Sequence, residues 1–464
     1  MSGTAPTAPS SGVHLQRALL PHGWARDVRV TIAEGCFASV EAEVAAQPGD
    51  ERVGVGLAGM PNVHSHAFQR AMAGLTEYRG QAHDTFWTWR ELMYRFLAHM
   101  SPDDIEAISA QAYVEMIEAG FTRVGEFHYL HNDPAGQPYG NAAELTERIV
   151  AAAREVGIGL TLLPVFYAHG GFGGAAPSAG QRRFVCTLDQ YARLFEASRT
   201  LIASLPHGRL GIAPHSLRAV TPEELRALIP LANGLPIHIH AAEQQREVED
   251  CIAWSGLRPV EWLLEYGPVD RHYCLIHATH LSAAEIERLA ASTAVAGLCP
   301  VTEANLGDGV FPASAYQAAQ GHFGVGTDSN IQISVAGELR MIEYTQRLRD
   351  RARNLLATAD RSTGRVLFEA ALSGGAQALG ASAAITVGAP ADLVSLDLEL
   401  PSMAAAAAAQ GGDQILDSWI FAAGSGVVQS VWCAGVKHVA NGQHRERALI
   451  AARYRATLER LLRA

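Results

Sequence analysis

Eight short apolar segments recur between residues 60 and 330, and each ends in polar or ionisable residues before a helix-like stretch. They are PNVHSH (61–66), FTRVGEFHY (121–129), LTLLPVF (160–166), LGIAPHS (210–216), LPIHIHAAE (235–243), CLIHATH (274–280), AGLCPVTEAN (296–305) and FGVGTDS (323–329). Strands that alternate with helices are typical of α/β folds, and eight repeats predict a (β/α)₈ TIM barrel. Barrel enzymes place their chemistry at the carboxyl ends of the strands, so the polar segment ends favour an enzyme.

The intervening stretches carry helix-start signals. SPDDIEAISAQAYVEMIEAG (101–120) opens with Ser101 as an N-cap and Pro102 at the first helical position. Similar openings occur in TPEELRALI (221–229) and LSAAEIERLA (281–290). These starts support the strand–helix alternation.

The two ends of the chain have a different pattern, with short alternating segments such as VRVTIAEG and ADLVSLDLEL. They predict one small β-sandwich domain built from both chain ends. A length of 464 residues, 48% of them hydrophobic, is ample for a large core and an accessory domain. The expected division is a disordered tail (1–12), the small β domain (13–59 plus 386–446), a metal-dependent barrel (60–385) and a C-terminal helix (447–464).

Charge and cysteine usage narrow the partners. The net charge of −11 argues against non-specific binding to nucleic acid or to an anionic membrane. The opening MSGTAPTAPSSG lacks the features of a signal peptide, and no stretch is apolar enough to span a bilayer. Six scattered cysteines without a CxxC motif suit reduced thiols. We therefore expect a cytoplasmic protein with a small-molecule substrate, and an exposed apolar helix face could support a homodimer.

His64 and His66 stand two residues apart in the first predicted strand. Side chains at i and i+2 of a strand point to the same face, so both imidazoles can reach one point. A short strand can grip a transition metal in this way. Two unrelated surface histidines are the alternative, because 19 histidines make chance pairs common.

Further ligand-type residues follow three other predicted strands, and in a barrel these strand ends converge on one pocket. They are His238, His240 and Glu243 after strand five, His277 and His280 after strand six, and Asp328 after strand eight. Each has an ordinary alternative role, as a satisfied core histidine or as a turn or N-cap aspartate. Their occurrence at four strand ends favours a shared metal, with His240 preferred to His238 because it lies nearer the strand end. Nitrogen and carboxylate ligands suit zinc, iron or manganese.

HSH, HIHAAE, LIHATH and GTDSN together resemble the motifs of the amidohydrolase superfamily, over the barrel and the split β domain. The resemblance implies His64, His66, His240 and Asp328 as ligands of a divalent metal, with Zn²⁺ preferred and Fe²⁺ open. Members with two metals usually bridge them with a carboxylated lysine on strand four. The one lysine here is Lys437, outside the barrel, so a single metal is expected.

A bound divalent metal lowers the pKa of its water. The HAAE spacing matches the HxxE of superfamily members that deaminate C=N bonds, which implies that Glu243 protonates the leaving nitrogen. Asp328 is expected to accept the proton of the water. His277 could polarise the water or stabilise the tetrahedral intermediate. Glu243 could instead be a first-turn carboxylate of the following helix.

The loops HAFQRAMAGLTEYRG, FWTWRELMYRF, GEFHYLHND and APHSLRAV resemble those of superfamily members that hydrolyse N-formimino-L-glutamate to N-formyl-L-glutamate and ammonia in histidine degradation. The residues that this resemblance implies for substrate binding are Gln69, Arg90, Tyr129, His215 and Arg218. The substrate has two carboxylates, and Arg90 and Arg218 could each clamp one of them. Arg90 could instead stack on an aromatic ring, and Arg218 could cap a helix.

Three other functions stay open at this point. A deaminase of the guanine, cytosine or triazine type shares the metal chemistry but needs no pair of arginines. An N-acyl amino acid hydrolase needs no HxxE proton donor and releases no ammonia. A non-catalytic barrel would be expected to lose the metal ligands that this chain retains.

Overall fold

The computed structural model describes residues 12–77, 85–409 and 412–463. The predicted tail at residues 1–12 lies outside these ranges except for Gly12. In the described part of the chain, no helix is both long enough and apolar enough to cross a membrane.

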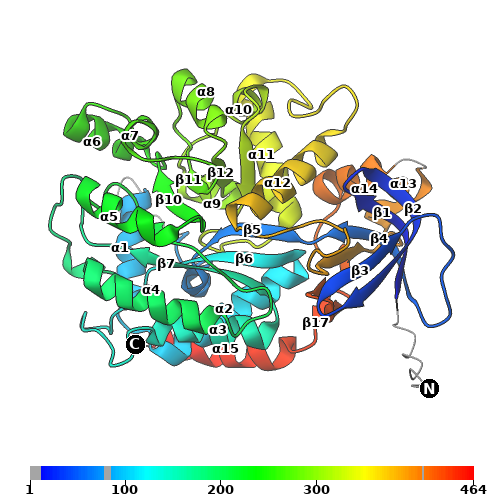
Figure 1. The fold of residues 1–464 in the computed structure, drawn as a ribbon, viewed down its shortest axis with the longest axis horizontal. Coiled ribbons are helices and arrows are strands. Elements are labelled where there is room, and N and C mark those ends of the chain that lie inside the picture. Colours follow the sequence, from blue (N-terminus) through cyan, green and yellow to red (C-terminus); the bar gives the residue numbers. More distant parts are fainter. Residues whose placement is uncertain (1–11, 78–84, 410–411, 464) are drawn as a thin grey trace, which may run out of the picture.

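All eight predicted barrel segments form strands, and the fourth is divided into two short pieces (Figure 1). They are β5 (Met60–Ser65), β6 (Phe121–His128), β7 (Gly159–Phe166), β8 (Arg209–Leu210), β9 (Ala213–Pro214), β10 (Ile237–Ala241), β11 (Tyr273–His277), β12 (Val295–Leu298) and β13 (His322–Val325). Every pairing among them is parallel, in the order β10-β11-β12-β13-β5-β6-β7-β8, with β9 beside β7. The N–H groups of His238 and His240 then donate to the carbonyls of Ile212 and His215, which closes the ring between strands four and five. The barrel prediction is confirmed.

Helices lie on the outside of this ring, as the alternation predicts. Around the barrel they are α1 (Phe86–Leu97), α2 (Pro102–Glu118), α3 (Glu144–Val156), α4 (Leu188–Ile202), α5 (Pro222–Ala232), α6 (Gln245–Ser255), α7 (Pro259–Tyr266), α8 (Ala283–Ala291), α9 (Pro300–Leu306), α10 (Ala313–Ala318), α11 (Val335–Asp350) and α12 (Thr363–Ala378). The expected caps are present: Ser101 Oγ accepts the N–H of Asp104, whose carboxylate accepts the N–H of Ser101. Thr221 caps α5 in the same manner, and Ser282 caps α8.

The two chain ends form one separate sheet of eight strands, mostly antiparallel. Its members are β1 (Val13–Leu20), β2 (Gly23–Ala33), β3 (Cys36–Glu41), β4 (Glu51–Ala58), β14 (Leu393–Leu396), β15 (Val428–Cys433), β16 (Val436–Ala440) and β17 (Gln443–His444). β4 pairs with β14, which joins the amino-terminal strands to the carboxyl-terminal ones. Leu15, Val30, Phe37, Leu393 and Trp432 belong to one buried cluster, so this sheet curls around its own core. Two short helices, α13 (Ala404–Ala408) and α14 (Asp413–Asp417), lie beside it.

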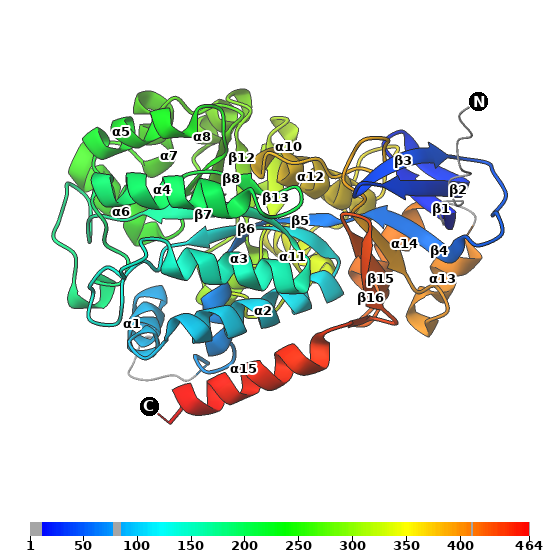
Figure 2. The same ribbon diagram turned by 60° about the horizontal axis from the view of Figure 1, so that its bottom comes forward.

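The chain ends in α15 (Arg447–Leu461), which runs along α2 on the outside of the barrel (Figure 2). Arg460 pairs with Asp104 of α2, and the hydroxyl of Tyr454 donates to the carbonyl of Arg70. Arg70 belongs to the short 3₁₀ helix η1 (Ala67–Met72), which follows the first barrel strand. Helix α15 therefore supports η1, the segment that directly follows His64 and His66 in the chain.

The carboxyl end of α12 closes the amino-terminal end of the barrel. A Cβ on Gly374 would lie 1.9 Å from the carbonyl oxygen of Phe323, so only glycine lets this helix approach β13 so closely. His238 Nε2 lies 2.8 Å from the carbonyl oxygen of Ala378, and Thr161 Oγ1 donates to the carbonyl of Leu379. His238 is therefore a core histidine at the floor of the barrel, where its Nε2 is paired and its Nδ1 has no partner among the described residues. It does not line the cavity that His240 faces.

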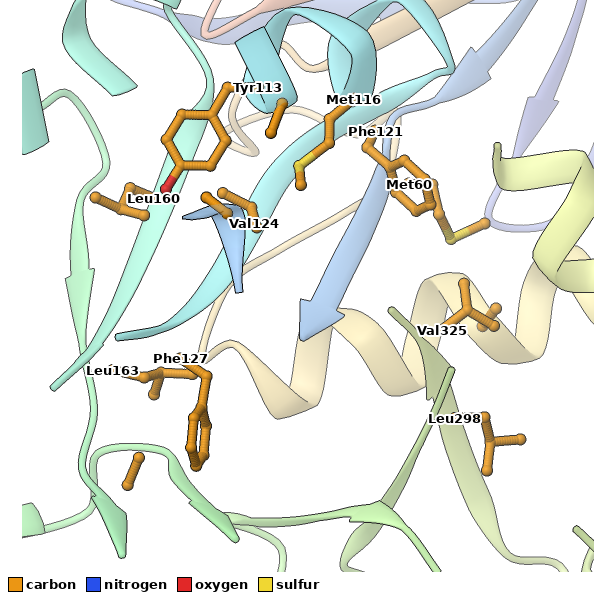
Figure 3. Packing of buried hydrophobic residues seen from close by; sticks show 14 of the residues in the cluster. Met60, Tyr113, Met116, Phe121, Val124, Phe127, Leu160, Leu163, Leu298 and Val325 are labelled. Atoms are coloured by element: carbon orange, nitrogen blue, oxygen red, sulfur yellow. The ribbon is translucent and has the colours of Figure 1, made fainter. Parts of the chain in front are cut away.

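Apolar side chains fill the space between the barrel strands and the neighbouring helices (Figure 3). Tyr113 and Met116 come from α2, and the other labelled residues come from the strands: Met60, Phe121, Val124, Phe127, Leu160, Leu163, Leu298 and Val325. Phe127 lies near the carboxyl end of β6 and contacts the rings of His64 and His240 edge-on. The core thus supports the histidines directly, since side chains packed at this density have little freedom to move.

One ion pair in the small sheet should make its stability depend on pH. Asp50 accepts two hydrogen bonds from the guanidinium of Arg29, at 2.8 and 2.9 Å, and two more from the N–H groups of Gly12 and Gln47. The hydrogen bond from Arg29 lowers the pKa of Asp50 from 3.8 to about 2. Because this pKa is lowered in the folded state, the stabilisation is fully present above about pH 4 and is lost as the pH falls towards 2.

We expect Asp50→Asn to destabilise the protein at pH 7 by about 2 kcal/mol. The difference from the native protein should shrink at about pH 3, where the native carboxylate begins to lose its charge. Thermal unfolding at both pH values measures this. Asp350→Asn is the matched control, because Asp350 accepts a similar pair of bonds from Arg349 on an exposed surface. An equal loss at both pH values would show that the charge of Asp50 is not responsible.

Candidate metal centre and active site

The four predicted ligands meet at the carboxyl end of the barrel. The Nε2 atom of His64 lies 3.1 Å from that of His66 and 3.2 Å from that of His240. Asp328 Oδ1 is 3.3 Å from His66 Nε2 and 3.5 Å from His64 Nε2. All four side chains are buried. Strands one, five and eight therefore present three nitrogens and one oxygen to a common point.

This donor set fits a divalent transition metal. In a tetrahedral site with bonds of about 2.0–2.1 Å, neighbouring ligand atoms are separated by about 3.3 Å, close to the spacing here. Nitrogens this close together would repel one another if each carried a proton. Burial, and then the charge of His66, lower the pKa of His64 to about 3, which leaves its ring neutral. Neutral imidazoles offer the lone pairs that a metal requires.

The orientation of two ligand rings is set by backbone carbonyls. His66 Nδ1 lies 3.0 Å from the carbonyl oxygen of Phe127, and His240 Nδ1 lies 3.0 Å from that of His215. A carbonyl only accepts hydrogen bonds, so in both rings Nδ1 carries the proton and Nε2 is left free to coordinate. Closure of the barrel places these carbonyls, since they come from neighbouring strands.

Asp328 is held by the first strand through the backbone. Its N–H donates to the carbonyl of His64, and its carbonyl accepts the N–H of His66. The φ angle of Asp328 is +44°, in the left-handed region, which non-glycine residues adopt where surrounding contacts enforce it. Burial alone would raise the pKa of Asp328, but the hydrogen bond with His64 and the other histidines around it hold the pKa below its ordinary value. Asp328 therefore faces the histidines as a carboxylate.

A network of amides and a hydroxyl holds strands one and eight together beneath the ligands, and sequence reasoning missed it. Asn62 Nδ2 donates to Thr327 Oγ1, which donates to Asn330 Oδ1, and Asn330 Nδ2 donates to the carbonyls of His66 and Asp328. The only available signal was that Asn62 lies two residues before the HSH motif and that Asn330 is the last residue of GTDSN.

His277 and Glu243 lie beside the ligands. His277 Nε2 is 3.7 Å from Glu243 Oε1 and 3.9 Å from Asp328 Oδ2. Burial alone would lower the pKa of His277, but the negative charge of Glu243, followed by Glu303 and Asp328, raises it to about 10. Burial raises the pKa of Glu243 against the opposing charges of His277 and Arg218. The site therefore combines Asp328, which keeps its negative charge, with Glu243, whose raised pKa favours the protonated form.

The alternative roles considered for strand-end residues can now be compared with their positions. Glu243 precedes α6, and the first-turn carboxylate of that helix is Glu247, which accepts the N–H groups of Ala242 and Glu243. His280 Nε2 contacts the carbonyl oxygen of Asp308, so His280 fits its structural role.

Three of the predicted substrate-binding residues form one wall of the pocket. Gln69 Nε2 donates to the hydroxyl of Tyr129 at 2.8 Å, and the ring of Tyr129 meets His66 edge-on. His215 follows β9, and its Nδ1 lies 3.0 Å from Ser216 Oγ. All three line a cavity of about 910 Å³ together with His66, His240 and Asp328.

The two predicted arginines line the same cavity but have different surroundings. Arg218 is paired with carboxylates of this chain, at 3.4 Å from Glu243 and 3.9 Å from Glu247. The guanidinium of Arg90 stacks over the ring of Trp87 at 4.6 Å, and within the described ranges it has no carboxylate partner. Arg90 therefore does stack on an aromatic ring, as the alternative predicted, while its charge faces the cavity.

Comparison with known proteins places the chain in a family. A model described as "Amidohydrolase family" matches residues 55–437, so the chain belongs to the amidohydrolase family. Within that family it resembles one group over nearly its whole length. A model described as "Formimidoylglutamate deiminase HutF, N-terminal domain" matches residues 10–54. A formimidoylglutamate deiminase from Pseudomonas aeruginosa is 50% identical, over 94% of this chain and 96% of that protein.

The other similar proteins include more distant deaminases and one solved structure that is described only as an amidohydrolase. A 5-methylthioadenosine/S-adenosylhomocysteine deaminase from Halobacterium salinarum is 30% identical, over 76% of this chain and 77% of its own length. Among solved structures, an amidohydrolase from Brucella melitensis has a TM-score of 0.94 at 53% identity, covering 97% of this chain and all of that one. A zinc-bound adenosine deaminase from Xanthomonas campestris shares the fold at 22% identity, with a TM-score of 0.80 over 98% of this chain and 99% of that one.

Proposed function

We propose that this chain hydrolyses N-formimino-L-glutamate to N-formyl-L-glutamate and ammonia, a step of histidine degradation. The observation that carries this proposal is the cavity itself. It is lined by three members of the cluster (His66, His240 and Asp328), by Glu243 and His277, and by the residues whose motifs implied a dicarboxylate substrate. The 50% identity to a formimidoylglutamate deiminase over 94% of the chain supports the same substrate.

The proposed cofactor is one divalent metal, with Zn²⁺ preferred and Fe²⁺ as the alternative, held by His64, His66, His240 and Asp328. When bound, such an ion activates a water molecule for attack. Three imidazole nitrogens and a carboxylate are a common donor set for zinc, and iron accepts the same atoms. No lysine stands in the barrel to bridge a second ion, which supports a single metal.

Asp328, His277 and Glu243 have different roles in the proposed reaction. Asp328 accepts a proton as the oxygen of water bonds to the amidine carbon, and His277 stabilises the negative charge that develops there. Glu243 donates a proton to the terminal nitrogen of the amidine and is reprotonated by the proton that Asp328 accepted. Asp328 then removes the second proton from the attacking oxygen, Glu243 delivers its new proton to the nitrogen, and the carbon–nitrogen bond breaks. Ammonia leaves, the oxygen remains as the carbonyl of the formyl group, and the proton on Asp328 passes to Glu243, so both residues return to their starting states.

Ammonia release from N-formimino-L-glutamate by the purified, zinc-loaded protein tests this function, with guanine and cytosine assayed alongside. We expect rapid release from N-formimino-L-glutamate alone. Turnover of a nucleobase in its place would keep the metal chemistry and overturn the substrate. Release of a carboxylic acid without ammonia would indicate an N-acyl amino acid hydrolase.

Substitution of the two arginines should separate binding from catalysis. Arg90→Ala should raise KM by about 10- to 100-fold and leave kcat nearly unchanged, because an ionic hydrogen bond is worth about 1.5–3 kcal/mol. Arg218→Ala should raise KM and also lower kcat, because Glu243 loses its paired cation. Steady-state kinetics measure both. Arg226→Ala, on the exposed face of α5, is the control. Native KM in both pocket variants would exclude a dicarboxylate clamp.

A cytoplasmic location and a homodimer remain predictions. All six cysteines are free, which is consistent with a reducing compartment.

A further inference from the structure

The two ring nitrogens of His277 have different neighbours. Nε2 faces Glu243 and Asp328 across the active-site cavity. Nδ1 points away from the cavity and lies 3.2 Å from Oε1 of Glu303, a residue with no role in the proposed reaction so far. His277 is fully enclosed at the end of β11, so neither nitrogen has bulk water as an alternative partner.

Glu303 is held in place by the backbone. It lies in the first turn of α9, the helix that follows strand β12, and its side chain is buried. The same Oε1 atom accepts the N–H of Cys299 at 2.8 Å, the last residue before the helix. This anchor defines where the carboxylate sits relative to β11, because Cys299 follows the strand that pairs with β11.

An ionised carboxylate only accepts hydrogen bonds, so the atom that meets it must carry a proton. Nδ1 of His277 therefore stays protonated whether the ring as a whole is neutral or charged. Any proton that His277 gains or loses during turnover moves at Nε2, the nitrogen facing Glu243 and Asp328. Without Glu303, a neutral ring could carry its proton on either nitrogen and could rotate about its side-chain bonds.

The backbone of His277 is also strained. Its φ angle is +70°, in the left-handed region that non-glycine residues rarely adopt. Such a conformation persists only where surrounding contacts enforce it, and it directs the ring between the cavity and α9. The hydrogen bond to Glu303 is one of those contacts.

We propose that Glu303 is a positioning residue for His277: it keeps the proton on Nδ1 and aims Nε2 at the reacting groups. The inference rests on the proposed function, because that function assigns His277 its role in the reaction. The contact between the two side chains does not depend on which substrate is turned over.

Glu303→Ala and Glu303→Gln test the proposal, with Glu338→Gln as the matched control. Glu338 is a second buried carboxyl that anchors the same helix, because it accepts the N–H of Val301 at 2.9 Å, and it does not contact His277. Burial raises the pKa of Glu338, so glutamine is a close mimic of its neutral form. Any effect of exchanging a buried carboxyl for an amide beside α9, without a change at His277, should appear in this control.

We expect Glu303→Ala to lower kcat by about 10- to 100-fold, with KM and metal content near native values. The kcat of Glu303→Gln should fall between that of the native protein and that of the alanine variant, since an amide oxygen can still accept a bond but carries no charge. Glu338→Gln should have native kinetics.

A spectroscopic measurement on the zinc-loaded protein separates this inference from the proposed function. In protein labelled with ¹⁵N-histidine, the native enzyme should give a slowly exchanging Nδ1–H resonance for His277, assigned by its loss in His277→Asn. The resonance should persist in Glu338→Gln and disappear in Glu303→Ala. Persistence in Glu303→Ala, or equal kinetic loss in Glu303→Ala and Glu338→Gln, would overturn the positioning role. Failure to release ammonia from N-formimino-L-glutamate would overturn the proposed function alone.

Discussion

Replacing His240 by alanine is expected to empty the metal site and to lower kcat/KM by at least about 10³-fold, equivalent to about 4 kcal/mol. His240 supplies one of three nitrogens that lie within 3.2 Å of their nearest neighbour in the cluster. Its loss leaves two nitrogens on one strand and a carboxylate, too few to close a tetrahedral site. Metal content per chain after dialysis and ammonia release at substrate concentrations well below KM measure the two effects.

The matched control is His238→Asn, two residues earlier on the same strand. His238 bonds the carbonyl of Ala378 at the floor of the barrel, and an asparagine amide can still donate a hydrogen bond there. This variant should keep one metal per chain and near-native kcat. A His240→Ala protein that retained both metal and activity would show that strand five contributes no ligand.

Glu243→Gln should lower kcat by about 10²- to 10⁴-fold while metal content and KM stay close to native. Glutamine keeps the size of the side chain and can still face Arg218, but it cannot donate the carboxyl proton that the leaving nitrogen needs. Single-turnover measurements separate this step from product release. The metal should remain bound, because Glu243 is not one of the four proposed ligands and its carboxylate is paired with His277 and Arg218.

Glu249→Gln provides the comparison for that experiment, because Glu249 is an exposed carboxylate of the adjacent helix α6 that contacts Gln245. Its kinetics should be native. If Glu243→Gln kept more than a tenth of native kcat, another group would have to be the proton donor. The HxxE interpretation would then be wrong, while the metal assignment would stand.

The fold could be predicted to a large extent because its signals are local. Each barrel strand is a short apolar run, and several helices begin after an N-cap residue such as Ser101 or Thr221. Hydrogen bonding within a few residues decides such features. The break in strand four between Leu210 and Ala213 was not predicted, since it depends on pairing with the strands on either side.

The histidine pairs show where local patterns stop being informative. Side chains two apart on a strand share a face, so His238 and His240 look equivalent in sequence. Both side chains point into the barrel, but at different depths. His238 contacts the carbonyl of Ala378 at the carboxyl end of α12, whereas His240 contacts His64. Position along the barrel axis distinguishes them, and that follows only from closure of the sheet.

Residue types and strand ends were enough to propose the barrel and a shared metal at its strand ends, while the resemblance to the amidohydrolase superfamily implied the donor set of His64, His66, His240 and Asp328 and the two arginines of the pocket. Only the tertiary structure decided which nitrogen of His66 and of His240 is free, that Arg218 pairs with Glu243, and that Glu303 lies next to His277 Nδ1. The physical reason is that strand and helix periodicity depends on near neighbours in the chain. The carbonyls and carboxylates that orient these rings come from other strands and helices, and they meet them only when the barrel closes.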